Sequence, residues 1–302
     1  MNRRKWMMLS GAAMAVRPGE AQQRRGAAPP DPAPAGATGL SGPESRDLAG
    51  QPVTAAGGLA SEESRDLSGL FEAEARGLAW LAAAGTVQVP EVLGWDAGAL
   101  VVSWVPPGEP SRAAAERFGR GLAGLHAAGA DEFGAPWPGF IASLPLLNDP
   151  ADSWPDWYGR QRLLPYLRRA AGAGTLSRAD VRLVEAVIGR LPELAGPAEP
   201  PSRIHGDLWA GNVLWSGGGG WLIDPAAHGG HRESDLAMLA LFGAPFAGRI
   251  LAAYQEAAPL ASGWRARVPL HQLHPLLVHV CLFGAGYRES ALAAARAALA
   301  AG

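Results

Sequence analysis

The chain is poor in the residues and patterns that mark several classes of protein. It has one cysteine, Cys281, so no disulfide forms within the chain. Its net charge of −2 gives no overall basic character for binding nucleic acid or an anionic membrane, so we predict neither as a partner. No run of about eighteen apolar residues occurs, so we expect no membrane-spanning helix. Its basic residues are almost all arginine, and the one lysine is Lys5.

The sequence contains enough apolar residues to form a substantial core. Hydrophobic residues make up 48% of 302 residues, a length that suits one large domain or two lobes. Residues 18–68, however, are rich in Ala, Gly, Pro and Arg and show no helical or strand periodicity. We therefore predict that residues 1–68 are a disordered or aberrant segment and that regular structure begins at Gly69.

The most informative stretch is IHGDLWAGNVLWSGGGGWLID, residues 204–224. Two apolar, β-prone runs at 213–215 and 221–223 flank a glycine turn, and glycines tolerate positive φ, so the stretch predicts a short hairpin. A hairpin folds the chain back and brings Asn212 at its entry close to Asp224 at its exit. Asp207, in the loop just before, faces the same space.

Two aspartates and an asparagine in this spacing suit phosphoryl transfer. A kinase catalytic loop supplies an Asp that accepts the proton of the substrate hydroxyl, and an Asn and a second Asp that hold Mg²⁺. We predict that Asp207 is the catalytic residue and that Asn212 and Asp224 are the metal ligands. The alternative is purely structural, with Asp207 and Asn212 as turn residues and Asp224 as a helix cap.

The segment HGDLWAGNVLW, followed by IDPAAHGGHRESDLAM, resembles the fructosamine-3-kinase (ketosamine-3-kinase) family. This family belongs to the aminoglycoside-phosphotransferase-like branch of the protein-kinase-like fold. Trp209, directly after HGDL, distinguishes the segment from most aminoglycoside and choline kinases. The resemblance extends from about Gly69 to the C-terminus. It implies an α+β, protein-kinase-like two-lobe fold with a small, truncated, β-containing N-lobe and a mainly helical C-lobe that carries the catalytic-loop hairpin.

The same resemblance implies the reaction and its participants. The cofactors would be ATP and Mg²⁺, and the substrate a ketoamine, such as a fructosamine or ribulosamine on a small amine or on a glycated protein lysine. Phosphorylation at the 3-hydroxyl would serve protein deglycation. An aminoglycoside- or choline-type kinase of the same fold is the alternative acceptor class. A catalytically impaired pseudokinase is a third interpretation.

The resemblance also divides the chain. Residues 69–107 correspond to a remnant N-lobe, made of a helix and a hairpin with the hinge at 103–107, and residues 108–302 to the helical C-lobe with the catalytic and metal-binding loops. Glu74, in the helix pattern FEAEARGLAWL, is by resemblance the Glu that pairs with a lysine in this fold, and its alternative is a solvated helix charge.

The hinge prediction concerns the nucleotide. By resemblance, the backbone of Ser103, Trp104 and Val105 holds the adenine edge of ATP. The alternative is an ordinary linker between a strand and a helix, since Pro106-Pro107-Gly108 ends the strand here.

The sequence departs from the family pattern before Gly69. A kinase N-lobe opens with a glycine-rich hairpin and a strand whose lysine pairs with the helix Glu. No V-x-V-K strand precedes the helix here, Lys5 lies far upstream, and Gly57-Gly58 lack flanking strands. This part of the fold has been lost, or its coding sequence is damaged or misread, or an arginine such as Arg65 replaces the lysine.

A second family-like pattern, W-x-x-WY-x-x-x-RL, contains Trp157, Tyr158 and Arg162. Aromatic faces and an arginine suit the wall of a sugar site, so we predict substrate contacts for these three residues together with Trp209. The alternative is that aromatic residues at helical spacing belong to the core.

Several other residues have mainly structural interpretations. His126 ends a helix and is interpreted as a capping or packing residue. His228 and His231 lack the further ligands that a metal site needs. Asp235, at the start of a helix, is interpreted as an N-cap or as an anchor for the backbone of the catalytic loop.

The N-terminus bears on localisation. Arg3-Arg4 before a short apolar run is similar to a twin-arginine export signal. No small-residue cleavage site follows, and an ATP-dependent enzyme finds little nucleotide outside the cell. We therefore expect a cytoplasmic protein and interpret the pair as a chance match or a misplaced start. A secreted binding protein is the alternative, and it requires cleavage of this segment.

Overall fold

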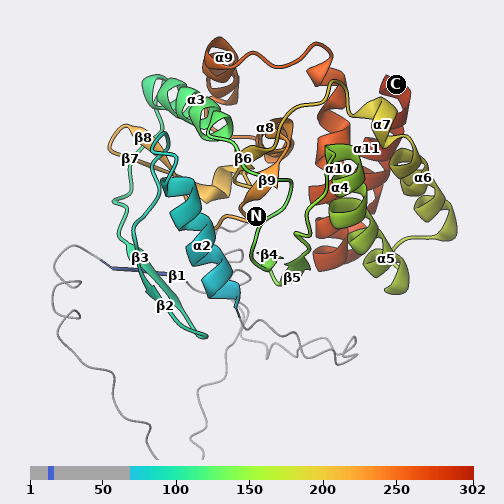
Figure 1. Cartoon of the computed structure of the whole chain (residues 1–302), viewed down its shortest axis with the longest axis horizontal. Helices are drawn as coiled ribbons and strands as arrows, with labels where there is room; N and C mark the ends of the chain where they lie inside the picture. The colour runs from blue at the N-terminus through green and yellow to red at the C-terminus, as the bar shows by residue number, and fades with distance from the viewer. Residues whose placement is uncertain (1–12, 17–68) are drawn as a thin grey trace, which may run out of the picture. The chain divides into compact units, whose positions relative to one another are not determined.

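The computed structural model describes the backbone of residues 13–16 and the whole of residues 69–302 (Figure 1). The predictions for the arginine pair, for Lys5 and for most of residues 1–68 lie outside this part of the chain. The described part has the mixed helix and strand content of the predicted α+β class. The predicted limits of the two lobes stay predictions.

The N-terminal part is a helix packed on a small sheet, as the sequence predicts. Helix α2 (Leu70–Ala82) is followed by the antiparallel strands β2 (Val92–Trp95) and β3 (Leu100–Ser103), and β1 (Ala13–Val16) pairs parallel to β3. The turn between β2 and β3 is closed by the Asp96 side chain, which accepts hydrogen bonds from the amides of Gly98 and Ala99. A small core fills the space between helix and sheet, made of Phe71, Ala75, Leu78, Leu100 and Val102.

The rest of the described chain is mainly helical (Figure 1). Its helices are α3 (Arg112–Ala127), α4 (Trp154–Trp157), the π-helical segment η2 (Tyr158–Leu163), α5 (Leu164–Gly172), α6 (Arg178–Gly189), α7 (Leu191–Leu194), α8 (Arg232–Phe242), α9 (Ala247–Ala257), α10 (Trp264–Phe283) and α11 (Arg288–Ala301), with the 3₁₀ segments η3 (Ala210–Asn212) and η4 (Gly284–Tyr287). Its strands form antiparallel pairs: β4 (Gly139–Ile141) with β5 (Leu144–Leu146), β6 (Ser202–Ile204) with β9 (His228–Gly230), and β7 (Val213–Ser216) with β8 (Gly219–Leu222).

Two larger apolar cores hold these helices together. One joins α2, α3, α8 and α9 to the β7–β8 hairpin and includes Leu81, Phe118, Leu222 and Tyr254. The other lies among α4 to α6, α10 and α11. The hairpin is therefore packed on its helical surroundings by its own apolar side chains, which fixes the loops at its two ends.

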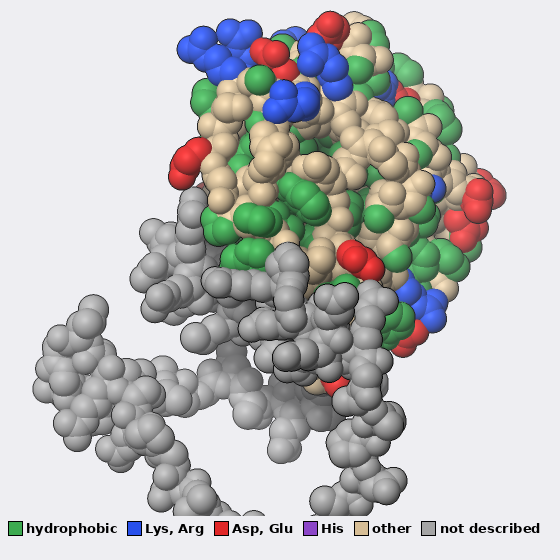
Figure 2. Space-filling model, turned by 90° about the vertical axis from the view of Figure 1, so that its left-hand side faces the viewer, with side chains coloured by type: hydrophobic (Ala, Val, Ile, Leu, Met, Phe, Trp, Pro, Cys, Tyr) green, Lys and Arg blue, Asp and Glu red, His purple; other side chains and the backbone are tan. Residues whose placement is uncertain are grey.

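Helix α10 and the segment after it are strongly apolar. The segment Trp264–Ala301 is long and apolar enough to cross a membrane by length and composition, but 56% of its most apolar window is buried inside the protein. Packing of α10 against α5, α8 and α11 is the behaviour of a core helix. On the face shown in Figure 2, most of the basic side chains of the described residues gather at the upper edge, with a few more at the lower right, and acidic side chains are scattered over a surface that is otherwise largely apolar or uncharged.

Candidate active site

The backbone before Asp207 is held by one buried carboxylate. Strand β6 leads into His205 and Gly206, whose amides donate to Asp235 of α8 over 2.8 and 2.9 Å. Asp235 also accepts from Nε2 of His126, 3.2 Å away. Of the two interpretations of Asp235, the anchor is confirmed, since the side chain that caps α8 is His231. Burial alone would raise the pKa of Asp235, but these hydrogen bonds and the neighbouring histidines lower it.

Gly206 is a position in this loop that strongly favours glycine. Its φ is +81°, and a Cβ there would overlap the carbonyl of Ala226. We expect Gly206→Ala to lower the free energy of unfolding by about 2 kcal/mol, because the residue must leave a conformation that L-residues rarely adopt. Denaturant titration measures this. Gly172→Ala, with no atom near its Cβ, is the control and should change stability by less than about 0.5 kcal/mol.

The β7–β8 hairpin brings the predicted catalytic and metal residues together. Gly217 and Gly218 have φ of 56° and 76° and form the two-residue turn. Nδ2 of Asn212 donates to the backbone oxygen of Asp207 (3.0 Å), to its carboxylate (3.1 Å) and to the backbone oxygen of Asp224 (3.3 Å). Asp207, Asn212 and Asp224 therefore lie in one place. Since the amide nitrogen of Asn212 is used, its oxygen is the atom left for a cation.

These carboxyl groups are partly buried and close to one another. Burial, and then the charge of Asp224, raises the pKa of Asp207 to about 7. Burial also raises the pKa of Asp224, which has a φ of +51°, an unusual backbone for a residue other than glycine. His205 lies beneath them, and burial lowers its pKa, so its ring is neutral. This group of side chains is therefore acidic, and the His205 ring adds no positive charge to it.

Glu74 of α2 joins this group. Its carboxyl group is hydrogen-bonded to that of Asp224, and burial followed by the charge of Asp224 raises the pKa of Glu74 to about 8. The alternative of a solvated helix charge is excluded by this contact. No lysine follows Lys5 in the sequence, so the lysine partner that the resemblance implies for Glu74 is absent from the described residues.

The predicted hinge lies at the end of β3. The amide of Ser103 donates to the carbonyl of Glu91 over 2.8 Å, and its hydroxyl accepts from the amide of Glu91 over 2.9 Å. Val105 is buried. The predicted contact of Ser103, Trp104 and Val105 with the adenine of ATP stays a prediction.

Trp209 lies at the start of an aromatic group that the sequence predictions missed. Its indole packs over Gly211 and meets Phe242 edge to face, at 6.3 Å between ring centroids. Phe242 contacts His279 at 4.9 Å, and His279 contacts Phe283 and Tyr287 at 5.4 and 4.7 Å. The available signal was the four-residue spacing of the last three rings. Nothing in that spacing connects them to Trp209, which lies some seventy residues earlier.

Trp157, Tyr158 and Arg162 lie in the core instead of beside Asp207. Their exposed fractions are 1%, 3% and 1%. Tyr158 donates to the carbonyl of Leu270, and Arg162 lies over the Trp157 ring and donates to Asn148. These three residues therefore lie in the core, as the alternative interpretation states. Their predicted contact with substrate stays a prediction.

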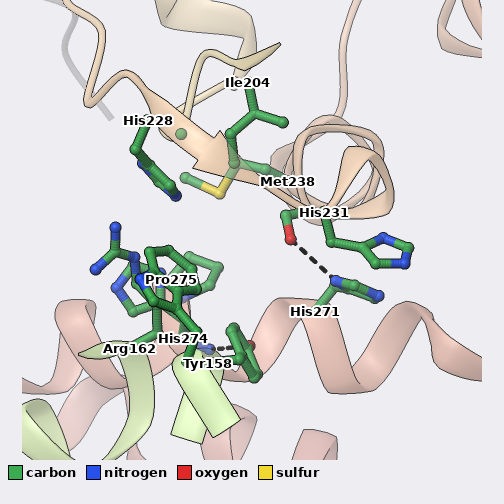
Figure 3. Close-up of a pocket in the computed structure, with 12 residues that line it drawn as sticks. Tyr158, Arg162, Ile204, His228, His231, Met238, His271, His274 and Pro275 are labelled. Carbon is green, nitrogen blue, oxygen red and sulfur yellow. Dashed lines mark hydrogen bonds between the residues drawn. The ribbon is translucent and has the colours of Figure 1, made fainter. Parts of the chain in front are cut away.

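These three residues line a cavity of about 20 Å³ behind Gly206, with room for about one water molecule (Figure 3). Figure 3 shows Arg162 and His228 on facing walls. Burial, and then the charge of Arg162, lowers the pKa of His228. The cavity is too small for a sugar.

His231, Glu233 and His271 place possible ligand atoms within 4.8 Å of one another. However, Glu233 already forms an ion pair with Arg267, and Nδ1 of His231 accepts from the Glu233 amide at the start of α8. Because that nitrogen accepts a hydrogen bond, the neutral ring carries its proton on Nε2, where a metal would have to bind. The group is a structural network that ties α8 to α10.

Comparison with known proteins identifies the family to which this chain belongs. The family model described as fructosamine kinase matches residues 60–301. The chain belongs to the fructosamine kinase family. A Synechocystis protein assigned as a ketoamine kinase is 36% identical over 231 residues, which are 73% of this chain and 76% of the relative. Mouse ketosamine-3-kinase is 35% identical over 163 residues, 54% and 52% of the two chains.

Solved structures agree with this assignment. A Thermobifida fusca protein assigned as a fructosamine-3-kinase has a TM-score of 0.76 at 61% identity, covering 78% of this chain and 81% of the other. The gentamicin complex of APH(2")-IIa, at 16% identity and a TM-score of 0.52, shares the fold, over 77% and 82% of the chains. The predicted family and the protein-kinase-like fold are therefore confirmed. Members of the fructosamine kinase family are phosphotransferases, and this chain is placed in that class of enzyme.

Proposed function

We propose that this fructosamine kinase family member transfers the γ-phosphoryl group of ATP to a sugar hydroxyl of a ketoamine, the 3-hydroxyl of a fructosamine or ribulosamine, in protein deglycation. The observation that carries the proposal is the meeting of Asp207, Asn212 and Asp224 at the ends of one hairpin. Membership of the family supports the ketoamine as acceptor. The proposal includes a cytoplasmic location, because ATP is available there.

Asp207 is the proposed general base. A base works best when its pKa lies near the working pH, and burial raises that of Asp207 to about 7. Asn212 holds the carboxylate through Nδ2, over 3.1 Å, and so fixes the direction in which Asp207 meets the acceptor hydroxyl. The proton of that hydroxyl passes to Asp207 as the oxygen bonds to phosphorus and the bond to ADP breaks.

The oxygen atoms of Asn212 and Asp224 fit a magnesium ion. The carboxylate of Asp224 and the amide oxygen of Asn212 are the hard oxygen ligands that Mg²⁺ prefers. Bound there, the ion would neutralise the charge of the transferred phosphoryl group. Asn212 can serve because its nitrogen is already used in three hydrogen bonds.

Trp209 is the proposed contact for the sugar. It is partly exposed, lies two residues after Asp207, and continues into the aromatic group of Phe242, His279, Phe283 and Tyr287. Aromatic rings cover the apolar face of a sugar, so this wall can bind a carbohydrate acceptor. Aromatic rings also bind quaternary ammonium groups such as that of choline, so the preference for a ketoamine comes from membership of the family.

The test is a direct assay of the purified full chain. ATP, Mg²⁺ and fructosyl-lysine are supplied, and ADP release and the phosphorylated ketoamine are measured together. Ribulosyl-lysine, a glycated peptide, an aminoglycoside and choline complete the acceptor panel. Turnover of an aminoglycoside or choline, with none of the ketoamines, contradicts the proposed acceptor.

Trp209→Ala should raise KM for the ketoamine about tenfold, equivalent to about 1.4 kcal/mol of lost binding, and leave KM for ATP unchanged. The reason is that the indole faces the acceptor and not the nucleotide. Steady-state kinetics with each substrate varied in turn measure both constants. Trp95→Ala, at a residue 51% exposed on β2, is the control and should alter neither. An equal rise in both KM values would argue against a sugar contact.

One observation favours a catalytically impaired protein as the second candidate. No lysine occurs after Lys5, and a kinase of this fold uses a lysine to hold the phosphates. An impaired protein predicts little thermal stabilisation by ATP with Mg²⁺ and no turnover of any acceptor.

A further inference from the structure

Helices α3 and α9 lie side by side and approach each other closely (Figure 1). A Cβ at Gly119 of α3 would overlap the carbonyl oxygen of Ile250 and lie 3.2 Å from Cβ of Ala253, so the glycine lets the two backbones meet. His126 lies two turns after Gly119 on the same face of α3, and Tyr254 lies one turn after Ile250 on α9. The packing of the two helices therefore brings the side chains of His126 and Tyr254 together.

His126 and Tyr254 form a buried polar pair. Their exposed fractions are 2% and 0%. The Tyr254 hydroxyl lies 2.8 Å from Nδ1 of His126, and the two rings meet edge to face at 5.4 Å between centroids. Burial raises the pKa of Tyr254, so the hydroxyl keeps its proton at neutral pH and can donate it.

The other ring nitrogen of His126 faces Asp235. Nε2 lies 3.2 Å from Oδ2 of that carboxylate, which can only accept a hydrogen bond, so this contact requires a proton on Nε2. A neutral imidazole has one proton, which leaves Nδ1 as an acceptor, and the Tyr254 hydroxyl is a donor for it. In the neutral ring, all three groups are satisfied when Tyr254 donates to His126 and His126 donates to Asp235.

Asp235 connects this pair to the loop that carries Asp207. Its Oδ2 accepts from His126 and also from the amide of His205, and its Oδ1 accepts from the amide of Gly206. Rotation of the carboxylate would weaken the contact with His126 and the contacts with the loop together. The direction of the carboxylate is therefore fixed from the helix side as well as from the loop side.

We propose that His126 and Tyr254 are positioning residues for the catalytic loop: Tyr254 holds His126 in the tautomer with its proton on Nε2, and that proton holds Asp235 against the loop amides. The proposal rests on the proposed function in taking Asp207, the next residue of the loop, as the general base. Neither positioning residue touches the acceptor or the nucleotide.

The first test is hydrogen exchange of the full chain, read by mass spectrometry on peptides that contain the amides of His205 and Gly206. His126→Leu, which keeps an apolar side chain but no donor, should raise the exchange rate of these amides about tenfold or more. Tyr254→Phe, which removes only the hydroxyl, should raise it about threefold. His126→Gln can still donate to Asp235 and should restore most of the protection. Unchanged exchange in a folded His126→Leu variant overturns the proposal.

Tyr166→Phe is the matched control for Tyr254→Phe. Tyr166 is also buried, at 2% exposed, and its hydroxyl donates to the carbonyl of Pro145 over 2.8 Å, in the other large core. Both variants should lower the melting temperature by about 2–4 °C, but only Tyr254→Phe should increase exchange in the loop. An equal increase in the control would show a general loss of stability and overturn the proposal.

Nitrogen NMR of the chain labelled with ¹⁵N-histidine tests the tautomer. The signals of His126 are identified by their loss in His126→Leu. They should show a protonated Nε2 and an unprotonated Nδ1 at neutral pH. A ring protonated on Nδ1, alone or together with Nε2, overturns the proposal.

Kinetics with fructosyl-lysine and ATP-Mg²⁺ give the last readout. His126→Leu should lower kcat about tenfold and leave both KM values within about twofold of wild type, because the loop loses its position while the binding groups remain. Faster exchange in the loop with an unchanged kcat overturns the positioning role. A wild-type protein that phosphorylates no ketoamine contradicts the proposed function, and the exchange and NMR results then decide this inference separately.

Discussion

Replacing Asp207 by asparagine is expected to lower kcat for ketoamine phosphorylation by about 10³-fold, the usual worth of a positioned general base. Asparagine keeps the size of the side chain and can still interact with Asn212, but it cannot take up the proton of the acceptor hydroxyl. The assay is ADP release with fructosyl-lysine and ATP-Mg²⁺. Unchanged turnover would remove Asp207 from the role of base.

The same variant has a second readout that separates a catalytic defect from unfolding. Burial and the charge of Asp224 raise the pKa of Asp207, so the folded protein disfavours the charged carboxylate. A neutral amide should therefore leave the melting temperature unchanged or slightly higher at pH 8. Asp131→Asn, at an exposed aspartate, is the matched control and should change neither rate nor stability.

Asp235→Ala is expected to cause the largest loss of stability, about 3–5 kcal/mol of unfolding free energy. Asp235 is 1% exposed and accepts hydrogen bonds from the amides of His205 and Gly206 and from His126. Its removal leaves these donors buried without an acceptor. The loop that carries Asp207 should also lose its position, so activity falls with stability. Denaturant titration gives the first quantity and the kinase assay the second.

The control for Asp235→Ala is Glu289→Ala. Glu289 also lies in the first turn of a helix, α11, but it is 72% exposed and pairs only with surface arginines. Its loss should change stability by less than about 0.5 kcal/mol. A change below about 1 kcal/mol for Asp235→Ala would mean that the loop is held by other contacts.

The stability that Asp235 contributes should depend on pH. Because folding lowers the pKa of Asp235, its charged carboxylate stabilises the folded state at neutral pH. This stabilisation is lost as the pH falls through the lowered pKa of the folded state.

The sequence predicted local structure well where a few residues decide it. The hairpin after Asn212 is confirmed, because glycines at 217 and 218 permit the positive φ that a two-residue turn requires. The sequence Ser177-x-x-Asp180 is likewise a capping-box pattern, and at the start of α6 Ser177 and Asp180 each accept a hydrogen bond from the other's amide. In both cases the interacting groups are close in sequence, since Ser177 and Asp180 are three positions apart and Val213 and Leu222 are nine positions apart.

Other predictions turned on contacts between distant segments. Trp157, Tyr158 and Arg162 have the composition of a sugar site and also that of a core, and only the packing of η2 against α10 shows that they lie inside. Likewise, the choice between cap and anchor for Asp235 depended on strand β6, which lies about thirty residues away in sequence.

The sequence by itself determined the family and the residues of the candidate site. These residues are two aspartates and an asparagine, whose spacing is fixed by one tight turn. Local geometry is enough for that, since a hairpin constrains its own ends. The tertiary structure alone decided that Glu74 faces Asp224 and that an aromatic wall continues from Trp209. Those contacts arise from helices docking across the fold, and the free energy that places a helix comes from its packed surface, which no short stretch of sequence contains.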